Sequence, residues 1–385
     1  MRKIFLKMDI PLLITMILFI ILGLVMVYSA SNITAIVRYG VSPSYFFVRQ
    51  SAFVIVALLV GVIIILKLPT SVYNTLAWPG LIIVIASLVL LFAHGRITNS
   101  SISWFDFKYF KVQPSEFAKS ILIVFSSVYY NTLTKRKVSN IYAYFVPLGA
   151  SLGVVGLVLM QPDLGSAFII GGISLMMFLS LPIVHKNFGK IAKVFGIGLI
   201  LFLIVFFAMK DRFMSSIRTS RFNFQNPCSR YTEETGYQVC NGFIAINNGG
   251  LFGVGLNHST QKYLYLPEAH TDFIFPIIVE ELGLIVGVVV ILGYAFILYR
   301  ILKVAKESEN MRCSMIAYGA FWYLGLHILI NLLGVLALMP LTGVPLPLLS
   351  YGGSFTVNAI LMLFLVERVN IENKDNRTRR EIKAL

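Results

Sequence analysis

Asp272 has the clearest capacity for chemistry, and it lies in the run Leu266–Phe275, directly before an apolar segment. An ionisable group at a membrane edge is costly to keep and is therefore a functional candidate by default. A carboxylate in such a place can act as a general base towards a nearby hydroxyl group. His270 lies in the same run and is taken as a supporting residue of the same site.

A second set of charges lies in the run Gln113–Lys119. Glu116 falls in the first turn of a predicted helix, where a negative charge complements the helix dipole. Lys119 lies one turn further along, where an ammonium group within the membrane needs a partner. Asp163 occupies a short turn on the same side, so we predict an ion pair between Lys119 and Asp163. This pair either clamps two helices together or orients the site and contacts substrate.

Glu280 and Glu281 follow Asp272 by about two helical turns, so we predict that they lie about 12 Å deeper in the same membrane helix. Adjacent helical residues point about 100° apart, so the two carboxylates need different partners, such as backbone groups or Asn331. The two glutamates either hold helices together or form a proton or ion path. His327, four residues before Asn331, is predicted to form a buried, hydrogen-bonded pair with it.

The uncharged segment Met339–Ser354 combines three prolines with a pair of glycines. Proline fixes φ, and glycine allows another backbone to approach closely. We therefore predict a rigid re-entrant wall that lines a cavity, because irregular backbone at membrane depth must be shielded from lipid. Ser350, Gly352 and Gly353 in this wall are candidate substrate contacts.

The longest connection, at about residues 210–272, adds the basic residues Arg218, Arg221 and Lys262. Basic side chains can hold a phosphate group. The glycine-rich run Asn247–Gly255 lacks the G-x-G-x-x-G spacing of a dinucleotide site, and we predict a turn beside a short membrane-dipping helix. Together, the carboxylates, the basic residues and the predicted apolar wall suit a substrate that is an amphiphile. Its anionic head group would lie outside and its lipid tail between helices.

Composition restricts the chain to polytopic helical membrane proteins. Hydrophobic residues make up 57% of it and charged residues 13%, about half the charge of a soluble domain. The mean hydropathy is +0.82. The apolar blocks are roughly 17–25 residues long, which matches a hydrocarbon core about 30 Å thick. We expect an all-α single transmembrane domain over residues 1–385, with spans near 11–30, 46–66, 75–94, 115–133, 142–160, 164–182, 189–209, 273–299, 313–338 and 351–368.

The distribution of Lys and Arg predicts the orientation. With the N-terminus inside, the inner segments carry most of these residues, and long loops escape the rule. Both termini are therefore predicted to be cytoplasmic, with the loop at about 210–272 outside and a basic tail at about 369–385 inside. We expect this tail to contact anionic lipid or, alternatively, a specific partner. The net charge of +15 follows largely from this asymmetry and does not indicate nucleic-acid binding.

The cysteines divide between the two predicted sides of the membrane. Cys313 is expected to be a reduced cytoplasmic thiol. Cys228 and Cys240 share the outer loop, where oxidation is possible, and the sequence leaves open whether they are bonded. No Cys, His and carboxylate spacing marks a structural metal site.

Taken together, four motifs resemble the SEDS family of bacterial peptidoglycan polymerases, which act in shape, elongation, division and sporulation. They are QPSEFAK (Gln113–Lys119), QPDLG (Gln161–Gly165), YLPEAHTDFIF with EELG (Tyr265–Gly283) and PLTGVPLPLLSYGGS (Pro340–Ser354), and they occur in the family's order across nearly the whole chain. The Gln261-Lys262 pair and EELG favour the division members of the family over the elongation members.

The resemblance implies a lipid II polymerase in the bacterial plasma membrane. Asp272 matches the family's catalytic aspartate, and Lys119 and Asp163 match its buried pair. Arg218 and Arg221 are then candidates for contact with pyrophosphate. A divalent cation, Mg or Mn, could neutralise the leaving group, although no ligand cluster is evident. The implied partners are a class B penicillin-binding protein and divisome or elongasome proteins.

Two other functions remain open at this point. A transporter that flips lipid II would use a similar cavity, but the sequence shows no inverted repeat, and its ionisable groups gather on one face. A non-catalytic scaffold that recruits division proteins would not need Asp272. An elongation-type polymerase is the third alternative.

Overall fold

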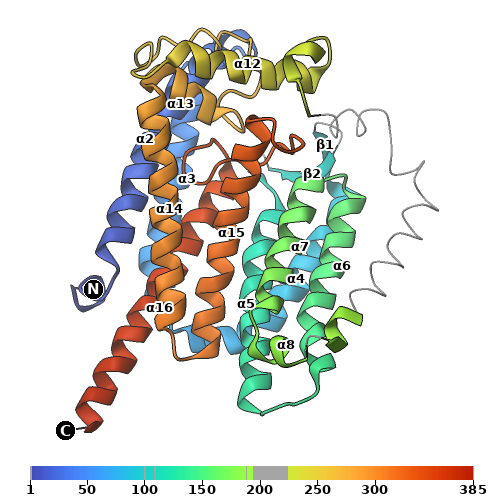
Figure 1. The fold of residues 1–385 in the computed structure, drawn as a ribbon, viewed down its shortest axis with the longest axis vertical. Helices are drawn as coiled ribbons and strands as arrows, with labels where there is room; N and C mark the ends of the chain where they lie inside the picture. Colours follow the sequence, from blue (N-terminus) through green and yellow to red (C-terminus); the bar gives the residue numbers. More distant parts are fainter. Residues whose placement is uncertain (1, 99–100, 108–109, 188, 194–223, 385) are drawn as a thin grey trace.

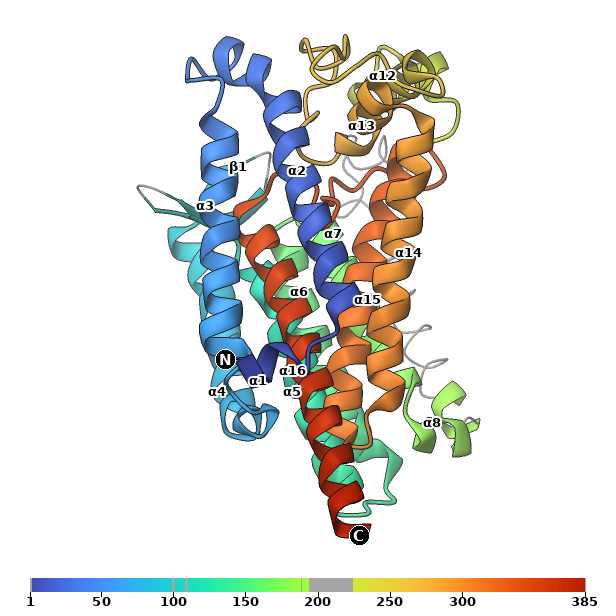
Figure 2. The same cartoon turned by 90° about the vertical axis from the view of Figure 1, so that its left-hand side faces the viewer.

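The computed structural model is a bundle of long helices, closed at one end by short helices and loops (Figure 1). It describes residues 2–98, 101–107, 110–187, 189–193 and 224–384. Short helices α12 and α13 lie at one end of the molecule, which we call the outer end (Figures 1 and 2). Both termini lie towards the opposite, inner end.

Most of the predicted spans correspond to observed helices. In the described residues, seven helices are long and apolar enough to cross a membrane, which agrees with a polytopic fold. The predicted seventh span, near 189–209, lies largely outside the described residues. The long helices are α2 (Ile10–Val37), α3 (Tyr45–Val60, continued by a π-helical turn Gly61–Ile65), α4 (Tyr73–His94), α5 (Pro114–Lys135), α6 (Val146–Met160), α7 (Leu164–Leu179), α14 (Leu284–Glu307), α15 (Met311–Val335) and α16 (Gly353–Ala384).

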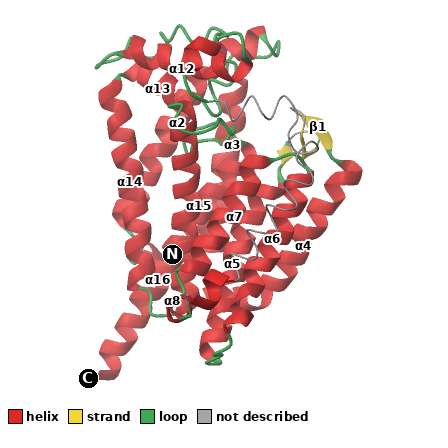
Figure 3. Cartoon of the chain, turned by 45° about the vertical axis from the view of Figure 1, so that its right-hand side comes forward, coloured by secondary structure: helices red, strands yellow, loops and turns green. Residues whose placement is uncertain are grey.

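Shorter elements connect these helices. They are α1 (Arg2–Phe5), two 3-10 turns (Thr70–Val72 and Ile141–Phe145), α8 (Pro182–Lys186), a third 3-10 turn η4 (Pro227–Arg230), α12 (Glu234–Gly249) and α13 (Ile274–Leu282). Three short antiparallel strands, β1 (Arg96–Thr98), β2 (Ser101–Asp106) and β3 (Lys111–Val112), lie between α4 and α5. Figure 3 shows the strands and most loops at the outer end. The all-α prediction holds for the bundle and missed this small sheet.

The predicted continuous span at 273–299 is wrong. The helix breaks at Gly283, whose φ of +89° favours glycine, and a Cβ there would overlap the carbonyl of Leu251. Only α14 runs down the bundle, while α13 stays at the outer end beside α12 (Figure 1). Glu280 and Glu281, in the last turn of α13, therefore lie in the outer layer and not deeper along a membrane helix.

The predicted re-entrant segment lies against residues within several helices, as expected for such a loop. The Tyr294 hydroxyl of α14 donates to the carbonyl of Pro347, and the Leu348 carbonyl lies so close to Gly23 of α2 that a Cβ there would overlap it. Gln50 of α3 donates to the Ser350 carbonyl at 3.1 Å. The carbonyls of Pro347 and Ser350 are thus bonded to helices, which stabilises irregular backbone within the bundle.

The inner end is tied together by ion pairs between the chain termini and the bundle. Arg300 of α14 donates to Asp9 at 2.6 Å, and Lys7 pairs with Asp375 of α16. The predicted tail, about 369–385, continues α16 as a helix through Ala384. A basic hollow lies at this end, lined by Glu309, Asn310, Asn376, Arg379, Arg380 and Lys383.

A disulfide joins Cys228 of η4 to Cys240 of α12, which resolves the pairing that the sequence left open. Cys313 is buried and free. Disulfides persist in oxidising compartments, so this bond is consistent with an extracytoplasmic outer end.

Candidate active site

Asp272 lies two residues before the start of α13 and is half-buried at the outer end. The Thr271 hydroxyl donates to its Oδ1 at 2.7 Å. The Asn331 amide of α15 donates to the Asp272 carbonyl at 2.8 Å. A Cβ placed on Gly343 would lie 3.4 Å from Asp272 Oδ2. The carboxylate therefore lies where α13, α15 and the re-entrant loop meet.

His270 supports this segment as a neutral, packed side chain. Its ring lies 4.6 Å from that of Phe46 and 5.6 Å from that of Tyr351, measured between centroids. Its carbonyl accepts a 2.9 Å hydrogen bond from the Tyr351 amide. Burial, together with the nearby positive charge of Arg38, lowers the pKa of His270 to about 4. The residue thus joins the Asp272 run to α3 and to the re-entrant loop.

The predicted ion pair between Lys119 and Asp163 is wrong. Lys119 is buried and pairs instead with Glu116, with 2.7 Å between Nζ and Oε1. The two residues lie one turn apart on α5, so their contact does not depend on how neighbouring helices pack. Asp163 serves as the N-cap of α7, where it accepts from the Ser166 amide at 3.0 Å and from Gln113 Nε2 at 2.9 Å.

His327 is the second partner of Lys119. Its Nδ1 lies 2.7 Å from the Tyr323 carbonyl, and its Nε2 lies 3.1 Å from Lys119 Nζ. A carbonyl can only accept a hydrogen bond, so Nδ1 carries the proton and Nε2 accepts from the ammonium group. His327 and Asn331 are both buried and hydrogen-bonded, as predicted, but each binds other groups.

The segment Thr342–Val344 lies between the Asp272 region and the first turn of α7. A Cβ on Gly165, in the first turn of α7, would lie 3.0 Å from Val344 Cγ2 and 3.3 Å from the Thr342 carbonyl. Asn331 also donates to the Val344 carbonyl at 2.8 Å. Three motifs that are far apart in the sequence thus meet in one region at the outer end of the bundle.

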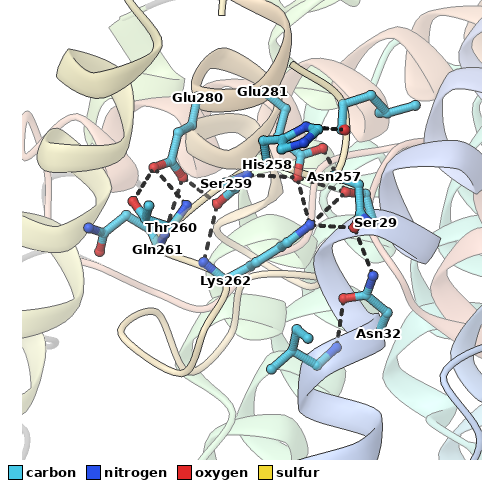
Figure 4. Close-up of polar contacts among 12 residues, drawn as sticks. Ser29, Asn32, Asn257, His258, Ser259, Thr260, Gln261, Lys262, Glu280 and Glu281 are labelled. Atoms are coloured by element: carbon cyan, nitrogen blue, oxygen red, sulfur yellow. Dashed lines mark hydrogen bonds and ion pairs between the residues drawn. The ribbon is translucent and has the colours of Figure 1, made fainter. Parts of the chain in front are cut away.

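Glu280 and Glu281 are both buried and form a separate network of polar contacts (Figure 4). Glu281 accepts from the Ser29 hydroxyl of α2 at 2.6 Å and from Lys262 Nζ at 3.1 Å. Glu280 accepts from the Thr260 hydroxyl at 2.9 Å and from the Ser259 hydroxyl. These contacts agree with the prediction that the two glutamates hold helices together. Asn331, which was predicted as a partner, is not among the groups that they bind.

Several predicted substrate contacts have structural partners. Lys262 is 1% exposed and its ammonium group binds Glu281, so it belongs to the glutamate network and is not placed as a phosphate contact. Ser350 is buried, and its hydroxyl accepts from the Leu346 amide at 2.8 Å. Gly352, which is half-buried, donates to Gln50 at 3.2 Å. A Cβ on Gly353 would lie 2.9 Å from the Phe53 ring. These groups shape the loop itself.

Arg218 and Arg221 lie outside the described residues. Two glutamines that sequence reasoning missed, Gln50 and Gln113, hold the re-entrant loop and Asp163. A polar residue in an apolar helix was the only signal for Gln50, whereas Gln113 opens the QPSEFAK motif. The described residues hold no group of three or more His, Cys, Asp or Glu side chains that could bind a metal ion.

Comparison with known proteins gives consistent matches over nearly the whole chain. The model of the cell cycle protein family FTSW_RODA_SPOVE matches residues 10–375. The chain is 34% identical over 388 residues to the probable peptidoglycan glycosyltransferase FtsW of Bacillus subtilis strain 168, covering 99% of this chain and 95% of that protein. It is 33% identical over 365 residues to stage V sporulation protein E of the same organism, covering 93% and 94%.

Solved structures show the same fold. A chain from a peptidoglycan synthase complex that coordinates polymerization and crosslinking superposes with a TM-score of 0.73 at 24% identity, covering 95% of this chain and 98% of that one. The rod shape determining protein RodA of Thermus thermophilus superposes with a TM-score of 0.65 at 27% identity, covering 94% and 96%.

Proposed function

The chain belongs to the FtsW/RodA/SpoVE, or SEDS, family of cell cycle proteins, and from this premise we propose that it is a peptidoglycan glycosyltransferase that polymerises lipid II with Asp272 as general base. The observation that carries the proposal is the position of Asp272. Its half-buried carboxylate lies at the outer end, and its backbone is fixed by Asn331 beside the re-entrant loop.

In the proposed reaction, the 4-hydroxyl of the acceptor sugar attacks the anomeric carbon of the donor. The Asp272 carboxylate takes the hydroxyl proton as the new glycosidic bond forms. The bond from the anomeric carbon to the undecaprenyl pyrophosphate breaks, and the pyrophosphate leaves with the electron pair. General-base assistance of this kind contributes about 10²–10⁴ in rate.

The backbone of Asp272 is held in place by its neighbours, which supports its role as the general base. A base must lie within hydrogen-bond reach of the proton that it removes, so its backbone has to be held against the wall that bounds the substrate. Asn331 bonds both Asp272 and Val344, and His270 packs against Tyr351. The buried Lys119–Glu116 pair contacts His327, which lies one turn before Asn331 on α15.

We propose that the pyrophosphate is held by Arg218 and Arg221, with or without Mg or Mn. The support for the arginines is their charge and their place in the long loop. The cation is supported by the charge of the leaving group alone, so the mechanism assigns no step to it.

The proposed cell biology is a plasma-membrane enzyme of division with both termini in the cytoplasm. The Lys and Arg distribution supports the orientation. The B. subtilis relative named FtsW supports division over elongation. A class B penicillin-binding protein, together with other divisome proteins, is the proposed partner, because a growing glycan strand must also be crosslinked.

The test is a gel of glycan products made from lipid II by the purified wild type and by Asp272→Asn. Each protein is assayed with and without the partner and a divalent ion, and Asp375→Asn at the inner end serves as the matched control. We expect glycan strands from wild type and control and at least a hundredfold less from Asp272→Asn, at the low end of the range for a general base.

Two outcomes would replace the proposal. If no variant makes glycan, yet labelled headgroups cross a reconstituted bilayer, the protein is a lipid II transporter. If Asp272→Asn cells build their wall normally at unchanged protein level, the protein acts as a scaffold.

A further inference from the structure

The turn Leu251–Leu256, between α12 and α13, exposes large apolar side chains at the outer end. Leu251 is 58% exposed, Phe252 80%, Val254 44% and Leu256 47%. The sequence has no Asp, Glu, Lys or Arg between Glu234 and Lys262. A compact group of exposed apolar side chains without charge marks an interaction surface.

The backbone of this turn is fixed by the break between α13 and α14. The carbonyls of Gly250 and Leu251 accept from the amides of Leu284 and Ile285 at 2.9 Å and 3.3 Å, which satisfies donors of the first turn of α14. The amides of Val254 and Gly255 donate to the carbonyls of Glu280 and Glu281 at 2.9 Å and 3.0 Å, which satisfies acceptors at the end of α13. The apolar side chains are therefore presented by a rigid backbone.

The same hydrogen bonds place the turn directly beside the first turn of α14. This helix is one of the membrane-spanning candidates, and 24 residues at about 1.5 Å per residue give it enough length to cross the hydrocarbon core. Its exposed residues in the first two turns, Leu284, Ile285, Val288 and Val289, are apolar. The turn thus adjoins the exposed apolar surface at the outer end of α14.

We propose that the Leu251–Leu256 turn is an interfacial membrane anchor whose side chains insert into the outer leaflet, at the boundary of headgroups and acyl chains. Apolar and aromatic side chains at this depth are removed from water while the backbone stays bonded. Its continuity with the α14 surface favours lipid over a protein partner as the occupant. The anchor goes beyond the proposed enzymatic function and does not depend on it.

The first test measures which medium surrounds position 252. Phe252→Cys is made in a Cys313→Ser background that keeps the Cys228–Cys240 disulfide, and the full chain is spin-labelled in phospholipid nanodiscs. The lipid control is Val288→Cys on α14, and the aqueous control is the exposed Thr232→Cys near η4. We expect dioxygen to relax the label at 252 several-fold more than a water-soluble nickel complex does, as at 288 and opposite to 232.

A label at 252 that behaves like the one at 232 would overturn the anchor. So would a label that meets water in the protein alone and is shielded from both reagents only when a partner protein is added, because the surface would then be a protein docking site.

The second test does not depend on the label. Phe252→Asp puts a charge into the leaflet and should speed hydrogen exchange at the Val254 and Gly255 amides in nanodiscs, whereas Phe252→Leu should leave it unchanged. Ile382→Asp, which changes a similarly exposed residue of α16, is the matched control. Equal exchange in Phe252→Asp and Phe252→Leu would contradict the proposal.

Discussion

The side-chain amide of Asn331 donates a 2.8 Å hydrogen bond to the backbone carbonyl of Asp272. The same nitrogen donates at 2.8 Å to the carbonyl of Val344 in the re-entrant loop. Because carbonyls only accept, the orientation of this amide is fixed. One side chain of α15 therefore sets the distance between the proposed base and the wall beside it.

Asn331→Ala should reduce both stability and polymerisation. The change leaves two inward-facing carbonyls without a donor, and a buried acceptor without a partner costs about 1–3 kcal/mol. Thermal unfolding in detergent and glycan synthesis at a temperature where the variant stays folded measure the two effects. Asn373→Ala is the control, since its amide also makes two hydrogen bonds, to Val304 and Ser308, but at the inner end. Full activity of folded Asn331→Ala would show that Asn331 is not needed to position Asp272.

Lys119→Met should destabilise the protein by about 3–5 kcal/mol, because it leaves the Glu116 carboxylate buried without its cation. The double variant Glu116→Gln/Lys119→Met should recover part of this loss. A double-mutant cycle from thermal or chemical unfolding gives the coupling energy. Coupling of Lys119 to Asp163 rather than to Glu116, measured with Asp163→Asn, would show that the pairing described here is incorrect.

His270 should make the protein less stable in acid. Its pKa falls from 6.5 in the unfolded chain to about 4 in the folded one, so the unfolded chain binds a proton first. The stability contributed by neutral His270 is fully present above pH 6.5 and is lost as the pH falls towards 4, by at most about 3 kcal/mol. His270→Phe keeps the ring packing and should show a smaller loss of thermal stability over that range. An identical pH dependence in both proteins would contradict this assignment.

Removing the disulfide should loosen η4 and the start of α12. Cys228 and Cys240 are separated by 12 residues, and closing a loop of this size contributes about 3 kcal/mol. The variant Cys228→Ser/Cys240→Ser should be cut faster by protease near residues 227–240, with Cys313→Ser as the control. In the denatured, unreduced wild type, only Cys313 should react with a thiol reagent. Reaction of all the cysteines would show that the bond is not formed.

Gly283→Ala should be strongly destabilising. Its φ of +89° is rarely adopted by other residues, at a cost of about 1–3 kcal/mol, and the added Cβ would also overlap the Leu251 carbonyl. Gly149→Ala in α6 is the control, because a Cβ there meets nothing within 4 Å. Unfolding of the two variants in detergent compares them, and equal stability would mean that the break at Gly283 is not required.

The membrane fold could be predicted from the sequence because lipid imposes a local rule. Every span must satisfy its own backbone and present an apolar surface over about 20 residues, so the positions of α2, α4 and α15 follow from hydropathy alone. The uncharged, proline-rich segment Met339–Ser354 was recognisable as re-entrant for the same reason. The position of Asp272 before an apolar helix also marked it without any knowledge of its neighbours.

Only the tertiary structure decided which groups meet. Lys119 had two carboxylates within plausible reach. Asp163 caps α7 and binds Gln113, and Lys119 pairs with Glu116 on its own helix. The apolar run after Asp272 reads as one helix, yet the approach of the turn at Leu251 breaks it at Gly283 and keeps Glu281 in the outer layer beside Lys262. Hydropathy reports the environment of each residue separately, whereas hydrogen bonds and ion pairs depend on distances between segments that the sequence does not encode locally.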